Sequence, residues 1–437
     1  MVTHVESWGR TPASLHAGVI DLQWRTDLPD LSRVGRSVLP FGNGRSYGDS
    51  CLNNDGILLR TRAMNHLIAI DTERRTVRCE SGVTFAELLD VLVPRGLFVA
   101  VTPGTKLLTV GGAIANDVHG KNHHSAGTFG CHVTRFELYR SDGTFTECSA
   151  TENAGLFAAT IGGMGLTGLI TWAEFSVVRI PSAFIRQENF RFANIDEYLA
   201  TSRTHDAAFP YVVSWIDCSV RGKGLGRGIY MGGSFMAVGS GAFDQPVVPT
   251  RTLPVDMPSW LLNSMTVRLF NIAFYHKQWK RHSRFRIHYE PFFYPLDAIH
   301  GWNKLYGSAG FYQYQCVLPY RTASDALHEL LRTTAKSGKA SFLAVLKNFG
   351  ARMSPGMLSF PAEGITLSMD FKNEGAPTLR LMDDLDGIVR SAGGRLYPAK
   401  DARMSKEHFI HSYPRWDEFR TWIDPKFSST FYRRMAD

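Results

Sequence analysis

The segment from residue 103 to 127, PGTKLLTVGGAIANDVHGKNHHSAG, constrains this chain more than any other stretch. It combines five glycines with three histidines and two lysines. Glycine has no Cβ, so the backbone there can adopt positive φ and approach a ligand closely. Successive backbone N–H groups freed in this way form a concave site for an anion such as a pyrophosphate. The segment therefore predicts a phosphate-gripping loop, although a Gly-Gly pair alone would equally suit an ordinary turn with solvated histidines.

Two further glycine-rich stretches lie beside predicted strands. Residues 38–50 read VLPFGNGRSYGDS, and no Gly-Lys-Ser/Thr follows at the spacing of a Walker A loop. Residues 161–168 read IGGMGLTG and match G-x-G-x-x-G formally. The residues after Gly168 alternate and are rich in Ile, Val, Thr and Phe, which predicts a strand and not the helix of a Rossmann fold. The three loops are therefore expected to surround one extended dinucleotide in another kind of fold.

The intervening segments predict an α+β order of elements. Alternating residues predict strands at 67–71, 76–79, 98–101 and 169–180, and a hairpin of 133–140 with 144–148. Thr84 and Glu87 have the spacing of a capping box, so we expect a helix from there to Pro94. This order differs from the regular βαβ alternation of a doubly wound sheet.

Size, charge and cysteines narrow the class of protein. A chain of 437 residues exceeds one comfortable core, so two domains are expected. The net charge of +8 favours phosphates, anionic lipid or nucleic acid as partners. The six cysteines show no CxxC spacing, so we expect reduced thiols and neither a zinc ribbon nor a disulfide framework. The first residues lack the apolar core of a secretory signal, and no run reaches the roughly 18 apolar residues of a membrane span.

Taken together, GNGRSYGD, the segment 103–127 and IGGMGLTGLI resemble the FAD-binding domain of vanillyl-alcohol-oxidase-type flavoenzymes. The stretches GFYQYQCVLP, SFLAVLKNFG, LSFP and GGRLYPAKDAR extend the resemblance from about Trp8 to the C-terminus, toward members that oxidise a polyprenyl-phosphoryl ribose. HGKNHHSAG and YPAKD are its most specific parts. The resemblance implies an α+β flavoprotein with two domains. The FAD-binding domain would comprise 1–180 and 395–437, and a substrate domain with an antiparallel sheet would comprise 181–394.

The resemblance also implies which residues form the site. The expected FAD-binding residues are Gly42, Gly44, Arg45, Ser46, Tyr47, Gly104, Thr105, Gly111, Gly112, Ala113, His119, Gly120, Asn122, Ile170, Tyr397 and Ala399. The expected substrate-binding residues are Lys121, Gln313, Gln315, Lys347, Ser368 and Lys400. Relatives with covalently bound flavin often have histidine in the first loop, where this chain has Tyr47, so we expect FAD to be held non-covalently.

The expected catalytic residues are Lys400, His119 and Tyr47. A cation beside the flavin can stabilise negative charge on the reduced ring or on a substrate alkoxide, although a lysine next to Asp401 could also be a surface residue. His119 could act as a base or as a hydrogen-bonding partner, or be an ordinary loop histidine. Tyr47 is expected to hydrogen-bond the substrate. A metal site formed by His119 with the histidines at 123, 124 and 132 is disfavoured, because no carboxylate or cysteine lies at a zinc spacing.

Three positions depart from the mycobacterial members of the family. Ser368 stands where they have cysteine, Thr366 where they have asparagine, and Phe293 where they have tyrosine. All three are expected on the substrate side of the flavin. The chemistry can survive these changes, so they bear on the shape of the pocket and the identity of the sugar.

The segment near 258–288 interleaves apolar and aromatic residues and ends in a basic stretch. This composition suits a mobile, membrane-facing segment whose aromatic residues enter the headgroup region while the basic end meets anionic lipid. An ordinary core helix followed by a solvated basic loop is the alternative, and is the more common structure for such a stripe.

The implied activity is FAD-dependent oxidation of the C2 hydroxyl of a polyprenyl-phosphoryl-β-D-ribose to the 2-keto sugar, the first half of epimerisation to arabinose. A separate NAD(P)H-dependent short-chain reductase and a membrane surface are the expected partners, with no nucleic acid, since no RNA-binding signature is present. We expect a cytoplasmic protein at the inner membrane and leave the periplasmic face open. A soluble sugar or alditol oxidase using oxygen and a non-catalytic basic membrane-binding protein are the alternatives.

Overall fold

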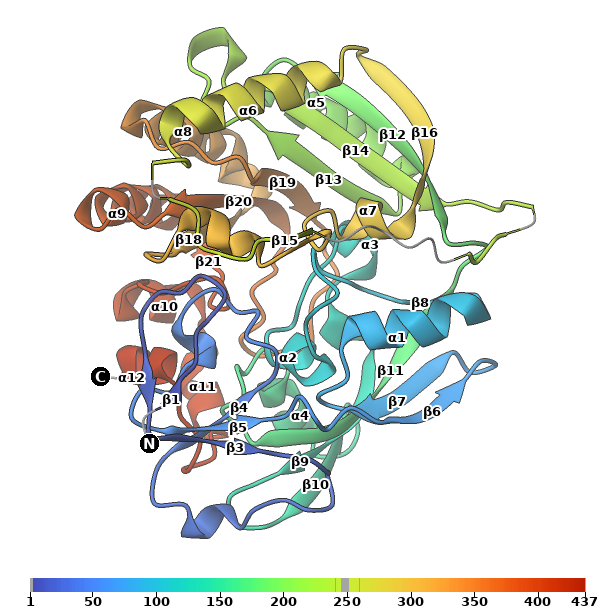
Figure 1. The fold of residues 1–437 in the computed structure, drawn as a ribbon, viewed down its shortest axis with the longest axis vertical. Helices are drawn as coiled ribbons and strands as arrows, with labels where there is room; N and C mark the ends of the chain where they lie inside the picture. Colours follow the sequence, from blue (N-terminus) through green and yellow to red (C-terminus); the bar gives the residue numbers. More distant parts are fainter. Residues whose placement is uncertain (1–2, 240, 245–250, 259, 437) are drawn as a thin grey trace.

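The computed structural model describes residues 3–239, 241–244, 251–258 and 260–436. Figure 1 shows two halves, with most of 181–394 above and the N-terminal third of the chain below, together with the C-terminal helices. Helices and antiparallel sheets occur in both halves, so the predicted α+β class is confirmed. The partition into separate domains at 180 and 394 stays a prediction.

The lower half begins with two small sheets. Its parallel sheet has the order β3-β5-β4, and a two-stranded ribbon joins β1 to β2. The strands are β1 (Thr3–His4), β2 (Leu15–His16), β3 (Gly18–Asp21), β4 (Val38–Phe41) and β5 (Ile57–Arg60). Strand β4 runs directly into the first glycine loop, which it thereby anchors to a buried sheet.

A six-stranded sheet with the order β10-β9-β11-β7-β6, in which β8 also pairs with β11, forms the centre of the lower half. Its strands are β6 (Leu67–Asp71), β7 (Thr76–Glu80), β8 (Leu97–Val99), β9 (Val133–Tyr139), β10 (Phe145–Ser149) and β11 (Leu169–Arg179). They lie where the alternating pattern predicts. Helix α1 (Phe85–Leu92) begins at the predicted capping box of Thr84 and Glu87. The strand after Gly168 confirms that the G-x-G-x-x-G match does not open a Rossmann helix.

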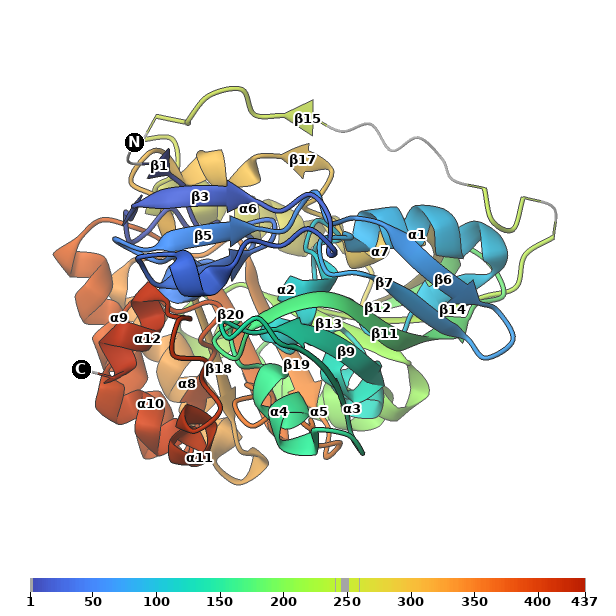
Figure 2. The same ribbon diagram turned by 90° about the horizontal axis from the view of Figure 1, so that it is seen from below.

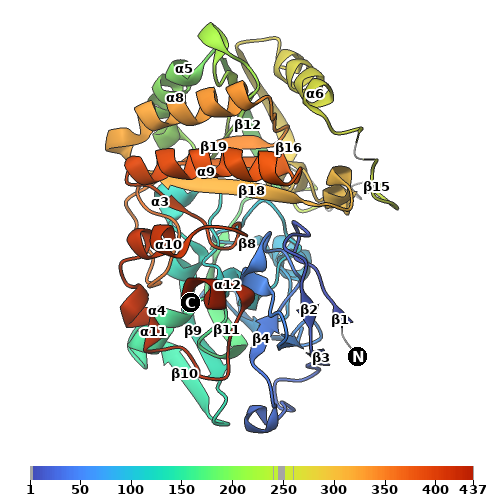
Figure 3. The same cartoon turned by 90° about the vertical axis from the view of Figure 1, so that its left-hand side faces the viewer.

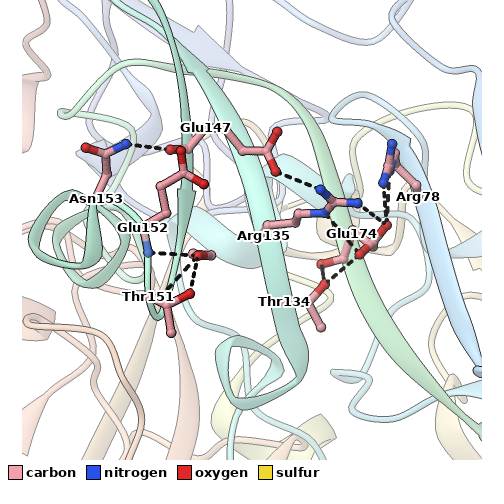
Figure 4. A network of polar contacts seen from close by, with 9 residues as sticks. Arg78, Thr134, Arg135, Glu147, Thr151, Glu152, Asn153 and Glu174 are labelled. Carbon is pink, nitrogen blue, oxygen red and sulfur yellow. Dashed lines mark hydrogen bonds and ion pairs between the residues drawn. The ribbon is translucent and has the colours of Figure 1, made fainter.

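Cross-strand ion pairs stabilise one face of this sheet (Figure 4). Arg135 on β9 donates to Glu147 on β10 at 2.8 Å and to Glu174 on β11 at 3.2 Å. Arg78 on β7 donates to the same Glu174 at 2.8 Å. Opposite charges on neighbouring strands stabilise a sheet by roughly 0.2–1 kcal/mol per pair. The network fixes the register of β11, which leads out of the third glycine loop.

The upper half is built on an eight-stranded sheet with the order β16-β12-β14-β13-β19-β20-β18-β21. Its strands are β12 (Phe184–Phe192), β13 (Tyr211–Ile216), β14 (Gly228–Phe235), β16 (His282–His288), β18 (Phe311–Leu318), β19 (Ala344–Phe349), β20 (Gly364–Lys372) and β21 (Arg395–Leu396). Helices α5 (Ile195–His205), α8 (Tyr320–Ser337) and α9 (Ala376–Ser391) cover one face, while α6 (Ser264–Lys277) lies over the other (Figure 3). The cavity described below opens between α6 and this second face.

The end of the chain returns to the lower half through α10 (Lys406–Ser412), α11 (Trp416–Arg420) and α12 (Thr430–Ala436). Figure 2 shows these helices near the N-terminal strands. Arg434 on α12 donates to Asp49 of the first glycine loop at 2.9 Å and to Asp401 at 2.9 Å. The three side chains tie α12 to the two segments that flank the site.

Shorter elements complete the fold. They are α2 (Val110–Ala115), α3 (His123–Ala126), α4 (Ala154–Thr160), α7 (Tyr289–Phe293), β15 (Arg251–Thr252), β17 (Ile299–His300), and the 3₁₀ turns η1 (Leu31–Arg33), η2 (Asp49–Cys51), η3 (Val93–Arg95), η4 (Phe129–His132), η5 (Asp206–Ala208), η6 (Gly222–Gly224) and η7 (Trp302–Tyr306). All six cysteines are free thiols. Within the described ranges, no helix is both long and apolar enough to cross a bilayer.

The 258–288 segment, apart from residue 259, which lies outside the described residues, folds as helix α6 and edge strand β16. Val267, Asn271 and Tyr275 bury one stripe of α6, while Met265 and Leu269 are 68% and 59% exposed. The helix is therefore buried along one stripe only. Of the basic stretch, Lys280 and Arg281 lie in an exposed loop after α6, whereas Arg284 and Arg286 lie on β16. Its predicted mobility and membrane contact stay predictions.

Candidate active site

One large cavity of about 1220 Å³ lies where the two halves meet. Pockets for a single drug-sized ligand measure roughly 300–1,000 Å³. The three glycine loops and α2 form one wall, and the second face of the eight-stranded sheet forms the opposite wall. The cavity therefore has room for a large cofactor and for a second ligand beside it.

Nearly all the residues expected at the site line this cavity. They are Gly42, Gly44, Arg45, Ser46, Tyr47, Gly104, Thr105, Gly111, Gly112, His119, Gly120, Lys121, Ile170, Gln313, Gln315, Lys347, Ser368, Tyr397, Ala399 and Lys400. Two expected residues lie behind the wall. Ala113 is fully buried on α2. Asn122 donates from Nδ2 to the Ala100 carbonyl at 2.8 Å and so holds the loop. The assignment of individual residues to FAD stays a prediction.

The Gly-Gly pair of the central segment was expected to form a loop with positive φ, and the structure shows another role for it. Gly111 and Gly112 lie inside helix α2, whose N-cap Thr109 accepts a hydrogen bond from the Gly112 N–H, so this part is not a loop. Neither glycine has positive φ. A Cβ on Gly111 would lie 2.9 Å from Cβ of Ser81, so this glycine permits close packing of α2 against the lower sheet. Gly104, in contrast, has open space on its Cβ side, where it borders the cavity.

Several cavity-lining polar atoms fit an incoming cofactor. The hydroxyls of Ser50 and Ser81 and Nε of Arg45 are buried and have no hydrogen-bond partner among the residues that the structure describes. Buried polar groups are nearly always paired in folded proteins, so such orphans at a cavity wall point to a ligand. Hydroxyl, guanidinium and exposed backbone amides are the partners that phosphate and flavin ring atoms require. The residues present therefore fit FAD.

Lys400 lines the cavity, and its Nζ lies 3.7 Å from the ring centroid of Tyr47. The backbone N–H of Tyr47 donates to the Ala399 carbonyl at 2.9 Å, so the first loop and the YPAKD segment form one unit. Burial lowers the pKa of Lys400 to about 7, while the charge of Asp370 opposes that shift. Burial raises the pKa of Tyr47 well above its usual value, so its phenol stays protonated. The surface-lysine alternative for Lys400 is therefore wrong.

His119 lies between two residues of the sheet. Its Nε2 is 2.9 Å from Nε2 of Gln315, and its Nδ1 is 3.1 Å from Nζ of Lys347. Burial, and then the charge of Lys347, lower the pKa of His119 well below the usual value. The imidazole is therefore neutral at pH 7 and a weak base, which favours hydrogen bonding over proton abstraction.

Two further lysines, both half-buried, border the cavity. Burial lowers the pKa of Lys347 to about 8 and that of Lys121 to about 7. Lys121 donates to the Phe292 carbonyl at 2.5 Å and lies 4.3 Å from the Phe292 ring centroid. Three desolvated amines around one cavity are costly unless an anion accompanies them. This arrangement suits a phosphorylated substrate.

Asp370, which is buried behind the cavity-lining Gln313, is a supporting residue that the sequence-based assignment missed. It accepts a hydrogen bond from Gln313 at 2.7 Å, and burial raises its pKa to about 7. The signal was present, since Thr366, Ser368 and Asp370 have the period-two spacing that places residues on one face of a strand. Asp297 was also missed. It accepts from the hydroxyl of Thr105 at 2.7 Å, and it lies in a loop whose position the sequence pattern does not predict.

The three departures from the mycobacterial pattern occupy different places. Thr366 and Ser368 lie on β20 in the cavity wall, and Thr366 donates to the Cys316 carbonyl at 2.8 Å. Phe293 touches the cavity but is 1% exposed and packs on Tyr211, with ring centroids 4.8 Å apart. Ser368 is therefore the departure that most directly changes the surface a substrate meets.

The histidines of the central segment do not gather around a metal. His124 hydrogen-bonds the Phe209 carbonyl at 3.0 Å, and His132 the Ala126 carbonyl at 3.0 Å. Among the residues placed by the structure, no group of three or more His, Cys, Asp or Glu side chains could hold a metal ion.

Comparisons with known proteins agree with this site. Residues 30–149 match the model of an FAD binding domain. The chain is 35% identical to the decaprenylphosphoryl-β-D-ribose oxidase of Mycolicibacterium smegmatis over 98% of this chain and 96% of that protein. It is 31% identical to an uncharacterised Streptomyces coelicolor protein over 81% of this chain and all of that protein. It is also 31% identical to mouse L-gulonolactone oxidase, over 38% of each chain. The chain therefore carries FAD and belongs to the family of vanillyl-alcohol-oxidase-type flavoenzymes that includes the decaprenylphosphoryl-β-D-ribose oxidase.

Proposed function

We propose that the chain oxidises the C2 hydroxyl of a polyprenyl-phosphoryl-β-D-ribose to the 2-keto sugar. The observation that carries this proposal is one cavity that is lined both by the glycine loops and by the amines of Lys121, Lys347 and Lys400. A relative that spans nearly the whole chain is named for oxidation of such a sugar. That relative does not favour the alternatives of a soluble alditol oxidase or a non-catalytic binding protein.

Bound FAD supplies the two-electron acceptor for this oxidation. Lys400, with a pKa of about 7, is partly neutral near pH 7 and can accept the proton of the substrate hydroxyl. Once protonated, it stabilises negative charge that develops beside it. We assign hydrogen bonding of the sugar to Gln315 and His119, and charge pairing with the phosphate to Lys347 and Lys121.

The keto product keeps its lipid phosphate and needs a hydride donor to become the arabinose epimer. We therefore propose a separate NAD(P)H-dependent short-chain reductase as the partner that completes the epimerisation. The test of the proposed reaction is anaerobic bleaching of the bound FAD by polyprenyl-phosphoryl ribose, followed by borodeuteride trapping of the product. We expect deuterium at C2. Bleaching by free ribose or alditols but not by the lipid-linked sugar would favour the alditol-oxidase alternative.

The pH dependence of anion binding tests the lysine assignment. Lys347 and Lys121 lose their charge as pH rises through about 8 and about 7 in the free protein. Affinity for geranyl phosphate should therefore be highest between about pH 6 and pH 7, and should fall by up to about tenfold per pH unit above pH 8. The charge of the phosphate itself changes little there, since its second pKa is about 6. Calorimetric titration of FAD-loaded protein gives the profile, and Lys347→Met should flatten it. An affinity that is constant from pH 6 to pH 9 would contradict the assignment.

FAD should be released when the protein is denatured. Both nitrogens of His119 face neighbouring side chains, at 2.9 Å and 3.1 Å. Burial raises the pKa of the Cys51 thiol in the cavity wall to about 12, which leaves almost no reactive thiolate. Acid precipitation followed by centrifugation should leave the yellow colour in the supernatant. Flavin that stays in the pellet would show a covalent bond.

We propose that the outer face of α6 contacts anionic membranes, at the cytoplasmic side of the inner membrane. Trp279 is 73% exposed and follows the helix, and Leu269 projects from its outer face. Apolar side chains beside lysines and arginines suit the interface of an anionic bilayer. Leu269→Ser with Trp279→Ser should lower flotation with phosphatidylglycerol vesicles by about tenfold. Phe145→Ser, which removes an exposed aromatic from β10, is the matched control. Equal losses in both variants would contradict the assignment.

A further inference from the structure

On the second face of the eight-stranded sheet, the side chains change from polar to apolar along one row of paired residues. Gln315 on β18 pairs with Ser368 on β20, which pairs with Val345 on β19. Val345 pairs in turn with Trp215 on β13, and Trp215 with Ile229 on β14. The row begins with polar groups at the proposed sugar site and ends with apolar side chains, all of which border the same cavity.

Helix α6 roofs the apolar end of this row. Phe270 and Phe274 line the cavity from above, and the Phe274 ring centroid lies 4.7 Å from that of Trp215. We call this region the apolar arm. It is bounded by Val213, Trp215, Ile229, Met231, Phe270 and Phe274. Helix α6 is held through its buried stripe, where Asn271 Nδ2 donates to Asp217 and to the Ser341 carbonyl, both at 3.1 Å. A helix of 14 residues is about 21 Å long, so it can roof an extended arm.

The apolar arm opens at the surface of the molecule. Leu261, Phe270 and Phe285 line the cavity and are also 39%, 48% and 41% exposed. These residues lie beside the outer face of α6, where Met265 and Leu269 project. The passage is lined mainly by apolar side chains, with Gln187 and Asn189 of β12 as polar exceptions. One end lies at half-buried lysines and the other at an exposed apolar surface, which suits a ligand with an anionic head and a long hydrocarbon chain.

We infer that the apolar arm binds the first isoprene units of the substrate's lipid chain and delivers the rest of the chain to the surface beside α6. The inference rests on the proposed function for the identity of the head group. The phosphate then lies at Lys347, on the same strand as Val345. The chain follows the row of Val345, Trp215 and Ile229 and leaves between α6 and β16. Because the arm encloses the isoprene units nearest the phosphate, the number of these units should determine the affinity.

The first experiment measures binding without any sugar. In FAD-loaded wild type, calorimetry should show that geranylgeranyl phosphate binds about 100-fold more tightly than geranyl phosphate, since each buried isoprene unit resembles a buried leucine side chain. Met231→Trp fills the arm and should reduce this ratio to under about tenfold. Met265→Trp makes the same substitution on the outer face of α6, away from the cavity, and should leave the ratio unchanged. Ile287→Trp, on the edge strand β16 and also at the cavity, serves if Met231→Trp does not fold.

The second experiment uses the sugar-bearing substrates. Met231→Trp should raise KM for flavin bleaching by geranylgeranyl-phosphoryl ribose at least about tenfold, and should change KM for the geranyl analogue by less than about threefold. Equal affinity of wild type for the two lipid phosphates, or equal effects of Met231→Trp and Met265→Trp, would overturn the inference. If neither sugar substrate bleaches the flavin but the phosphates keep their length dependence, the proposed reaction fails while the lipid site stands.

Discussion

Lys400→Ala is expected to slow bleaching of the flavin by substrate about 10²–10³-fold, by analogy with the loss of one preorganised donor at a developing charge. The variant should still bind FAD, because the glycine loops and α2, which also line the cavity, keep their backbone in place. The loss follows from the position of the amine, which lies over Tyr47 in a buried site where its charge is poorly screened by water. Anaerobic stopped-flow absorbance at saturating substrate measures the rate.

Two comparisons show whether Lys400 acts through its proton. Wild-type bleaching should rise with pH up to about 7, as the neutral amine that accepts the hydroxyl proton becomes populated. Lys400→Ala should lose this step in the profile. Lys400→Arg should restore little, because a planar guanidinium stays protonated and cannot replace a compact amine. A bleaching rate in Lys400→Ala within about threefold of wild type would remove Lys400 from the chemistry and leave His119 as the leading candidate.

Arg434→Met is expected to lower the free energy of unfolding by about 3–5 kcal/mol, the usual cost of removing one partner from a buried ion pair. Arg434 pairs with Asp49 and Asp401, whose side chains are 2% and 5% exposed, and the variant leaves both carboxylates without their cation. Urea denaturation followed by tryptophan fluorescence measures the loss. Arg415→Met is the matched control, since its pair with Glu418 is half exposed and should contribute about 0–1 kcal/mol.

The pH dependence of this loss has a definite sign. Burial already raises the pKa of Asp49 above its usual value, and Arg434 opposes that shift. Without Arg434, the folded state binds protons at Asp49 more readily than the unfolded state does, so the stability of the variant falls as pH rises. The difference between wild type and Arg434→Met should therefore shrink toward pH 5. A loss equal to that of Arg415→Met would show that the other hydrogen bonds of these loops suffice.

Local rules predicted much of the lower half of the molecule. The capping box at Thr84 and Glu87 predicts the start of α1, and alternation predicts β6, β7, β9 and β11, because helix caps and strand periodicity depend on neighbouring residues. The helical form of the segment around Gly111 was missed. Two glycines argue against a helix by propensity. Tertiary packing explains Gly111, whose Cβ side is closed by Ser81, and the Thr109 side chain closely approaches Gly112.

Site residues could be predicted from the sequence only where they belong to a specific motif. The resemblance brought Lys400 and His119 to one cavity, which no local pattern could do, since they lie on segments far apart in the chain. Asp370 could have been found from the spacing of Thr366 and Ser368. The apolar arm could not, because it depends on pairings between β13, β14 and β19 that arise from long-range topology.

The pairing of Arg434 with Asp49 bears on how the protein is made. These residues lie 385 positions apart, so the first glycine loop leaves the ribosome long before the side chain that neutralises its carboxylate exists. The hydrogen bond from the Tyr47 N–H to the Ala399 carbonyl likewise forms only after Ala399 is synthesised, and closing so long a loop is entropically slow. During synthesis the glycine loops therefore pass through a period without the segment that carries the reactive amine. A nascent chain that acquires flavin in that period holds a cofactor it cannot yet use, which separates cofactor loading from the onset of oxidation.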